Sequence, residues 1–220
     1  MRPLDYLHLQ MRLEGKQVVD LDRIREVEAV PGEELPLILL AQLTDGKQIT
    51  YYSEVMSPDL KEELASAEID FTHIDPLLQL LKAHGMPCEA GHYKTYVFPS
   101  MPANDMEVVC LSKYEARVKA FGFGGFAGDV YAILRGGKIV SACVSARENG
   151  RCGEAWVYTD AEHRGQGLAQ QVVRAWARSL LEAGKVPFYS HKIENRASAG
   201  LAQRLGLQPV FEEVAIELTS

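Results

Sequence analysis

Apolar residues in the second half of the chain recur at two different spacings. Leu168, Val172, Trp176 and Leu180 repeat at helical spacing and predict an amphipathic helix over 168–183. Shorter apolar runs between glycine and polar turns predict strands over 130–134, 139–145, 154–159, 186–191 and 210–218. A second helix is predicted over 196–205, before the last strand. A strand, a helix and a strand that follow a meander imply a mixed sheet with a right-handed crossover.

The first half predicts an α+β arrangement of its own. Asp45-Gly46 tolerates the positive φ of a hairpin turn, and Ser57-Pro58 and Asp75-Pro76 each place proline at the first helical position after a capping residue. The expected elements are hairpin strands over 37–43 and 48–53, helices over 57–67 and 75–84, and a strand over 93–98. Because 99–105 contains two prolines and turn formers, we expect a linker there, an N-terminal segment over 1–105 and a second domain over 106–220.

Composition and charge narrow the possible function classes. The 220 residues are 47% hydrophobic and 24% charged, as in ordinary globular proteins. The net charge of −7 is uneven, with 9 basic and 18 acidic side chains in 1–105 against 14 and 12 in 106–220. Without a basic stripe, or an apolar run near the roughly 20 residues that cross a bilayer, neither nucleic acid nor a membrane is an expected partner. Four cysteines without C-x-x-C spacing favour reduced thiols in a cytoplasm.

The most informative stretch is Arg164-Gly-Gln-Gly-Leu-Ala169, which joins the strand over 154–159 to the helix that follows. A helix N-terminus presents unpaired N–H groups and a partial positive charge, and both favour phosphate. Gly165 and Gly167 lack the Cβ atoms that would hold a pyrophosphate away from those N–H groups. The stretch therefore predicts a phosphate-binding turn, although a short glycine-containing turn is also a common purely structural way to begin a helix.

Segments on both sides of this turn extend the pattern. Lys138–Ser145 follows a Gly-Gly turn, and Pro187–His191 leads into Asn195-x-x-Ser198-x-x-Leu-Ala-x-x-Leu-Gly-Leu207. Together with R-x-x-G-x-A, these segments resemble the ordered motifs of the GCN5-related N-acetyltransferase (GNAT) superfamily over about residues 106–218. The resemblance implies an α/β (α+β) fold, with a mixed, mostly antiparallel sheet and helices on both faces. It also implies acetyl-CoA as the acyl donor.

The resemblance assigns roles to particular positions. It implies that backbone groups of Val157, Tyr158 and Thr159 meet the pantetheine arm of the donor. It implies that the glycine turn holds the pyrophosphate, through Arg164, Gly165, Gln166, Gly167, Leu168, Ala169 and Gln170. It also implies that Asn195 and Ser198 touch pantetheine or adenosine. A structural reading stands beside the last pair, because asparagine is a good helix N-cap and serine is small enough for packing alone.

Proton transfer is where the chain departs from the family. The superfamily often places a tyrosine seven residues after the asparagine as general acid, and Ala202 stands there instead. Tyr158 and Tyr189 are the candidate acids, although aromatic residues in strands are usually packed core. Glu154 and His191 are the candidate bases, since a carboxylate on a central strand and a histidine at a strand end suit proton transfer. A solvent-facing strand end explains Glu154 equally well.

Other features carry less weight. His73, His84, Cys88 and His92 lie close in sequence but fit no recognised zinc spacing, so no metal is expected. The glycine-rich stretch 121–128 precedes a strand rather than a helix, so it is interpreted as a mobile segment near the substrate groove. The tail after Leu207 is short for the two closing strands that the superfamily usually has. The sheet edge is therefore either truncated or completed by the N-terminal segment.

The expected function is transfer of an acetyl group from acetyl-CoA to a primary amine by direct attack in a ternary complex. A small-molecule amine is the favoured acceptor, and residues 1–105 are expected to set acceptor specificity. The missing tyrosine keeps open a CoA-binding sensor without transferase activity. The acidic first half keeps open a protein or peptide N-acetyltransferase, and a plain interaction module is a third alternative. A homodimer is the default expectation for assembly.

Overall fold

The computed structural model describes residues 1–21, 24–29, 35–67, 69–103 and 107–219. The chain forms two compact units, one built from Met1–Lys94 with Val210–Ser220 and the other from Thr95–Pro209. These limits differ from the expected boundary at residue 105, because the end of the chain joins the first unit. The expected linker, 99–105, lies partly outside the described residues.

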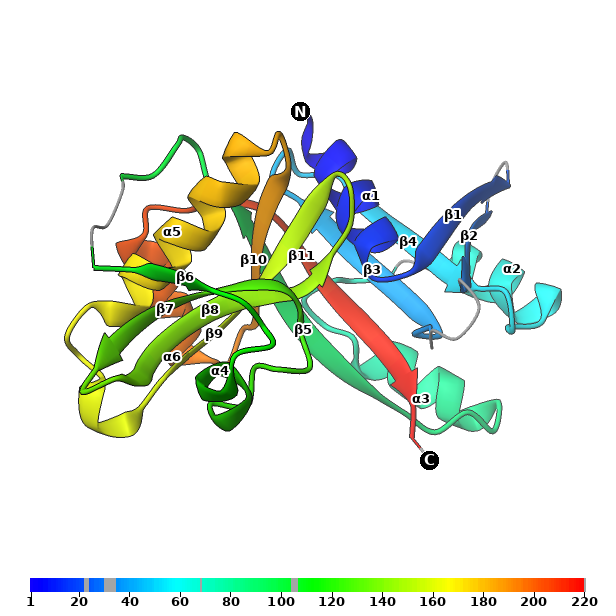
Figure 1. Ribbon diagram of the computed structural model, residues 1–220. Helices are drawn as coiled ribbons and strands as arrows, with labels where there is room; N and C mark the ends of the chain where they lie inside the picture. Colours follow the sequence, from blue (N-terminus) through cyan, green and yellow to red (C-terminus); the bar gives the residue numbers. More distant parts are fainter. Residues whose placement is uncertain (22–23, 30–34, 68, 104–106, 220) are drawn as a thin grey trace. The chain divides into compact units, whose positions relative to one another are not determined.

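The second unit is built on a sheet whose neighbours are antiparallel except for one parallel pair, β9 and β10 (Figure 1). Its strand order is β10-β9-β8-β7-β6. The strands are β6 (Val109–Leu111), β7 (Ala127–Arg135), β8 (Lys138–Glu148), β9 (Cys152–Thr159) and β10 (Val186–Lys192). The antiparallel neighbours are joined by short turns. The parallel pair is joined by a helical crossover, as parallel strands require.

Helices cover both faces of strands β7–β9, with α5 (Leu168–Glu182) on one side and α4 (Ala116–Ala120) on the other (Figure 1). The face of α5 that buries Val172 and Trp176 packs in one apolar cluster with the face of α6 (Arg196–Arg204) that buries Leu201. A second cluster contains Val118 of α4. The mixed, mostly antiparallel sheet with helices on both faces is therefore confirmed.

Strand β8 supplies both clusters by pointing alternate side chains to opposite faces. Cys143 packs toward α5, whereas Ala142 and Val144 pack in the α4 cluster. Val140 also belongs to the α5 cluster, which strict alternation from Cys143 would not allow. The pairing of β7 with β8 shifts register between Ile133 and Leu134, which indicates a bulge. The bulge turns Val140 to the same face as Cys143.

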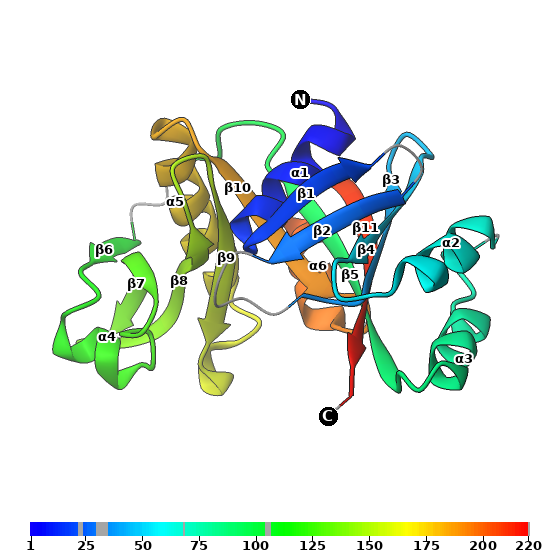
Figure 2. The same cartoon turned by 90° about the vertical axis from the view of Figure 1, so that its right-hand side faces the viewer.

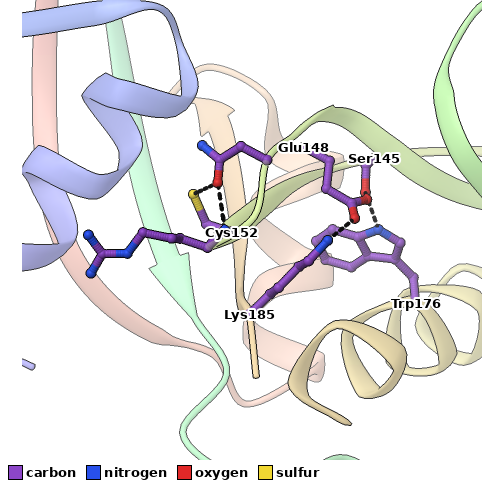
Figure 3. A network of polar contacts seen from close by, with 7 residues as sticks. Ser145, Glu148, Cys152, Trp176 and Lys185 are labelled. Carbon is purple, nitrogen blue, oxygen red and sulfur yellow. Dashed lines mark hydrogen bonds and ion pairs between the residues drawn. The ribbon is translucent and has the colours of Figure 1, made fainter. Parts of the chain in front are cut away.

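A buried polar network ties α5 to the sheet (Figure 3). The indole Nε1 of Trp176 donates to Ser145 Oγ at 3.0 Å, and Ser145 donates to Glu148 Oε2 at 2.5 Å. Lys185 Nζ donates to the other oxygen of Glu148 at 2.7 Å. Because every bridging group has a partner, the tryptophan gains the full benefit of burial without leaving its N–H unsatisfied.

The first unit contains its own set of strands in the order β1-β2-β4-β3-β11-β5. Its elements are α1 (Pro3–Leu13), β1 (Lys16–Leu21), β2 (Ile24–Ala29), β3 (Ile38–Leu43), β4 (Gln48–Ser53), α2 (Pro58–Ser66), α3 (Asp75–Ala83), most of β5 (Cys88–Val97) and most of β11 (Gln208–Leu218). Strand β11 pairs antiparallel with β3, so the short tail finds its partner in the first half of the chain.

Adjacent tyrosines on β4 show how this sheet is covered. Tyr52 packs with Leu60 and Leu77 of α2 and α3, whereas the hydroxyl of Tyr51 lies 2.7 Å from Nε2 of His8 on α1. Consecutive strand residues point to opposite faces, so α1 covers one face and α2 with α3 the other. Figure 2 shows α2 and α3 next to each other and apart from α1.

Candidate functional site

The parallel ladder between β9 and β10 is short. It runs from Cys152 opposite Val186 to Glu154 opposite Phe188, and both strands continue beyond its end, to Thr159 and Lys192. Strands that separate in this way leave backbone N–H and C=O groups pointing into the gap, where a bound molecule can pair with them.

A cavity of about 610 Å³ lies along the parted end of β9. Most of the residues that the sequence assigned to donor binding line it: Val157, Tyr158, Thr159, Arg164, Gly165, Gly167, Leu168, Ala169, Gln170, Asn195 and Ser198. Gln166 does not; its side-chain Nε2 lies 3.5 Å from the carbonyl oxygen of Glu162. The volume is within the range of small-molecule sites.

The turn at the wall of this cavity has the backbone shape that its glycines allow. Gly165 and Gly167 both have φ of +77°, and Gly167 caps α5. A Cβ at Gly165 would meet no atom within 4 Å, so the conformation rather than crowding calls for glycine. Arg164 Nε donates to the carbonyl of Thr159 at 3.1 Å, which holds the start of the turn against the end of β9.

Two further cavity residues with basic side chains were missed from the sequence. Arg204 lines the cavity from α6, and His163 lines it from the short helical turn η1 (Ala161–His163). Within the described residues, no hydrogen-bond partner reaches the buried Nδ1 of His163. Residues three apart lie on the same face of a helix, and Ser198, Leu201 and Arg204 follow one another at that spacing. The predicted position of Ser198 could therefore have indicated Arg204.

Asn195 and Ser198 are placed by a capping interaction. Asn195 Oδ1 accepts a hydrogen bond from the Ser198 backbone N–H at 3.1 Å, which makes Asn195 the N-cap of α6. Both residues also line the cavity. Asn195 is thus a helix N-cap, as the structural alternative expected, and it also lies at the wall of the cavity.

The two candidate acids lie in very different surroundings. Tyr189 is 2% exposed, and its hydroxyl lies 3.5 Å from the carbonyl oxygen of Ser198. Burial raises the pKa of the Tyr189 hydroxyl above its ordinary value. Tyr158 is 44% exposed and lies edge-on to Phe121, with ring centroids 5.6 Å apart. Both line the cavity, so the site brings the two tyrosines together with the predicted donor residues.

The two candidate bases lie outside the cavity lining. Glu154 Oε2 is 3.5 Å from Nη1 of Arg147 on the neighbouring strand. Nδ1 of His191 lies 2.9 Å from the carbonyl of Lys192, and because a carbonyl only accepts, Nδ1 carries the proton. Nε2 is then an acceptor, and among the described residues none bonds it in its buried position. The ring stacks on Tyr96 at 5.5 Å.

The histidines and cysteine of the first half are dispersed. His84 Nε2 lies 3.3 Å from Glu63, and His92 Nε2 lies 3.4 Å from Glu212. Across the described ranges, no group of three or more His, Cys, Asp or Glu side chains is arranged to hold a metal ion. In the same ranges, every helix is too short or too polar to span a bilayer.

Comparison with known proteins agrees with this geometry. A family model described as GNAT acetyltransferase matches residues 118–215. The uncharacterized N-acetyltransferase YdfB of Bacillus subtilis (strain 168) is 35% identical over 100 residues, which is 46% of this chain and 37% of the relative. The chain thus spans little more than a third of the curated relative that it matches.

Solved structures share the fold. A GNAT-family acetyltransferase from Novosphingobium aromaticivorans DSM 12444 has a TM-score of 0.51 at 18% identity, covering 60% of this chain and 66% of its own. A GNAT-family acetyltransferase from Colwellia psychrerythraea has a TM-score of 0.51 at 13% identity, covering 100% and 98%. The second half of this chain is therefore similar to GNAT acetyltransferases, in sequence over residues 118–215 and in fold.

Proposed function

We propose that the protein transfers an acetyl group from acetyl-CoA to the nitrogen of a primary amine. The observation that carries the proposal is the cavity along the parted end of β9, which ends at the glycine turn before α5. An elongated donor with phosphates at one end and a thioester at the other suits such a site. The reaction is placed in a cytoplasm, where widely spaced cysteines without C-x-x-C pairs stay reduced.

The residues of the cavity fit the donor at both ends. The N-terminus of α5 offers N–H groups and a partial positive charge to the pyrophosphate, and Arg164 and Arg204 add positive charge at the same cavity. At the other end, the backbone of Val157–Thr159 borders the cavity and would pair with the amide groups of pantetheine, as an added strand would, except for the Thr159 carbonyl, which already accepts from Arg164. The acetyl group is then expected toward the start of β9, away from the phosphates.

Direct attack needs only proton transfers from the protein. The amine nitrogen forms a bond to the thioester carbonyl carbon, the carbon–sulfur bond breaks, and the amine loses a proton while the thiolate gains one. Tyr189 is the proposed proton donor, because its hydroxyl lines the cavity and is protonated at neutral pH, as burial raises its pKa further above that range. The Tyr189 hydroxyl approaches the carbonyl of Ser198 on α6. Ala202 follows Ser198 by four residues, so the hydroxyl lies on the helix face that carries Ala202.

A basic group must accept the amine proton, and His191 and Glu154 both remain candidates. His191 has the required tautomer, with Nδ1–H held by Lys192 and Nε2 open to accept. Because that nitrogen is buried, it would act through the neighbouring side chains or a water rather than by direct contact. Glu154 lies partly buried on the central strand beside Arg147.

The test is calorimetric titration with acetyl-CoA. The parent protein should bind with micromolar affinity, and Gly167→Glu should lose binding by at least about 100-fold, because it puts a carboxylate where phosphate is expected. Gly137→Glu is the matched control: Gly137 has φ of +79° and lies in the β7–β8 turn, where an added Cβ meets no atom within 4 Å, against one side-chain atom at 3.8 Å at Gly167. Equal affinity in all three proteins, or no binding by the parent, would refute the proposed donor site.

The alternative of a CoA-binding sensor rests on Ala202 in place of the family tyrosine. It is separated from the enzyme by assaying release of the CoA thiol over a panel of small amines and a lysine-containing peptide. Donor binding without turnover on any acceptor would favour the sensor. Turnover on the peptide alone would favour the protein N-acetyltransferase.

A further inference from the structure

Four aromatic side chains form a partly exposed surface on the face of β9 that points away from α5. We call Phe121, Phe126, Trp156 and Tyr158 the aromatic platform. Trp156 is 53% exposed and stacks on Phe126, with ring centroids 5.9 Å apart and planes 28° apart. Tyr158 meets Phe121 edge-on. The four rings thus come from two segments and contact one another in pairs.

The alternation of β9 separates this platform from the core. Ala155 and Val157 pack against the α5 cluster, so Trp156 and Tyr158 point to the opposite face. Isolated exposed apolar side chains are ordinary, whereas a group of contacting aromatic rings that includes the exposed Trp156 and Tyr158 is a candidate binding surface. Trp156 in particular leaves a large flat ring available on one side of its stack with Phe126.

The loop after α4 is shaped to hold two of these rings in place. Phe123 is 4% exposed and its N–H donates to the carbonyl of Val118 at 3.0 Å, which fixes the loop in the core. Gly122 has φ of +87°, a conformation that glycine adopts without strain. With Phe123 anchored, Phe121 and Phe126 are held on either side of it against β9.

The platform adjoins the place where the acetyl group is expected. Tyr158 belongs both to the platform and to the lining of the donor cavity. The phosphates are assigned to the far end of that cavity, so the thioester is expected near the part of β9 that carries Trp156. This step rests on the proposed function, because the position of the thioester follows from it.

Charged side chains at the two ends of β9 would orient a molecule bound on the aromatic platform. Glu154 precedes Trp156 by two residues and so shares its face, and Arg164 lies at the other end with Cζ 5.8 Å from the Tyr158 ring centroid. Arg147 approaches Glu154 at 3.5 Å and is itself half exposed. An occupant with a cationic end toward Glu154 and a flat ring over Trp156 would match both the charge and the shape.

We propose that the aromatic platform binds the acceptor, and that the acceptor is a small amine joined through a short linker to an aromatic ring. The ring stacks on Trp156 and the amine end lies toward Glu154. A flexible polyamine and a peptide backbone carry no ring that could stack on Trp156. Stacked aromatic pairs contribute energy beyond the area that they bury, so an aromatic acceptor is favoured over an aliphatic one of the same size.

The test compares 2-phenylethylamine, 2-cyclohexylethylamine, spermidine and a lysine-containing peptide at saturating acetyl-CoA, with release of the CoA thiol as readout. The proposal expects kcat/KM for 2-phenylethylamine to exceed that for 2-cyclohexylethylamine by about fivefold or more. Trp156→Ala should raise KM for 2-phenylethylamine by about tenfold and abolish this preference, with the Kd for acetyl-CoA unchanged.

Tyr114→Ala is the control, since Tyr114 is 73% exposed and lies outside the platform. It should change neither constant, and thermal melting should show that both variants are folded. Equal use of the cyclohexyl and phenyl amines, preference for spermidine or the peptide, or an unchanged KM in Trp156→Ala would overturn the proposal. So would donor binding without transfer to any amine. A parent protein that fails to bind acetyl-CoA would instead remove the proposed function itself.

Discussion

Two strand pairs in this protein differ in how far their pairing extends. In the first unit, β3 and β11 pair through six consecutive positions, from Leu43 opposite Phe211 to Ile38 opposite Ile216. In the second unit, β9 and β10 pair through three positions and then part. Both strand pairs contribute apolar side chains to a buried cluster, so the two pairs do not differ in whether they help to form the core.

The difference separates a strand pair that completes its own ladder from one that leaves room for the donor that we propose. A complete ladder satisfies its own backbone groups, whereas a ladder that stops early leaves groups that need another partner. The cavity lies at the parted pair, next to residues 157–159. A site of this kind therefore depends on backbone position, and few of its side chains need to be chemically distinctive.

The largest expected effect tests the complete ladder. Ile216 is fully buried in the cluster that joins β11 to α2 and α3, so Ile216→Ala should lower the free energy of unfolding by about 2–5 kcal/mol. Leu218→Ala, at a residue 55% exposed on the same strand, should cost much less. Urea unfolding measures both. Similar stability of the two variants would contradict a structural role for this pair.

The next effect tests chemistry at the parted pair. Tyr189→Phe should lower kcat by about 100-fold with an unchanged Kd for acetyl-CoA, because it removes the proposed proton donor and little volume. Burial raises the pKa of Tyr189, so the parent enzyme should keep this donor protonated as the pH rises, up to and beyond the ordinary tyrosine value of about 10. A pH profile of kcat for the parent enzyme checks this.

Tyr131→Phe provides the comparison for that variant. Burial also raises the pKa of Tyr131, but Tyr131 lines a different cavity, beside Cys110 and Arg178. Its kcat should match that of the parent. A loss of the same size in both variants would point to a general effect on the fold rather than to proton donation.

The smallest effect concerns the phosphate end of the cavity. Arg204→Ala should raise the Kd for acetyl-CoA by about tenfold at low salt, and by less at high salt, because screening already weakens a surface charge. Arg204→Lys should restore part of the loss. Arg196→Ala on the same helix, outside the cavity lining, should have little effect. A salt-independent loss in Arg204→Ala would argue against a charge interaction.

Sequence patterns anticipated the elements with strong local signals. The helix over 168–183 and the strands over 48–53 and 154–159 agree with α5, β4 and β9 to within two residues at each end. Periodic apolar spacing and glycine turns are local properties, so they survive in any context. Helix α4 is short, at Ala116–Ala120, because Ser112–Glu115 before it forms a turn with its own hydrogen bond.

Other elements needed information that a single sequence lacks. The sequence patterns do not predict α1, β1, β2 or β6, whose stability depends on partners elsewhere in the chain. The glycine turn before α5 was recognisable from spacing and glycine content, and its role in binding the donor stays a prediction. The platform was not, because Phe121, Phe126 and Trp156 are brought together only by the fold, and each alone was indistinguishable from a core aromatic residue.

The place of β11 has a consequence for the order of assembly during synthesis. Residues 95–209 are contiguous and can fold as they emerge, whereas the apolar face of β3 must wait for a strand made after all of them. Until residue 216 leaves the ribosome, Ile38 and Leu40 lack their last neighbours. The first half of the chain is therefore the part whose apolar residues wait longest for their neighbours, even though it is translated first.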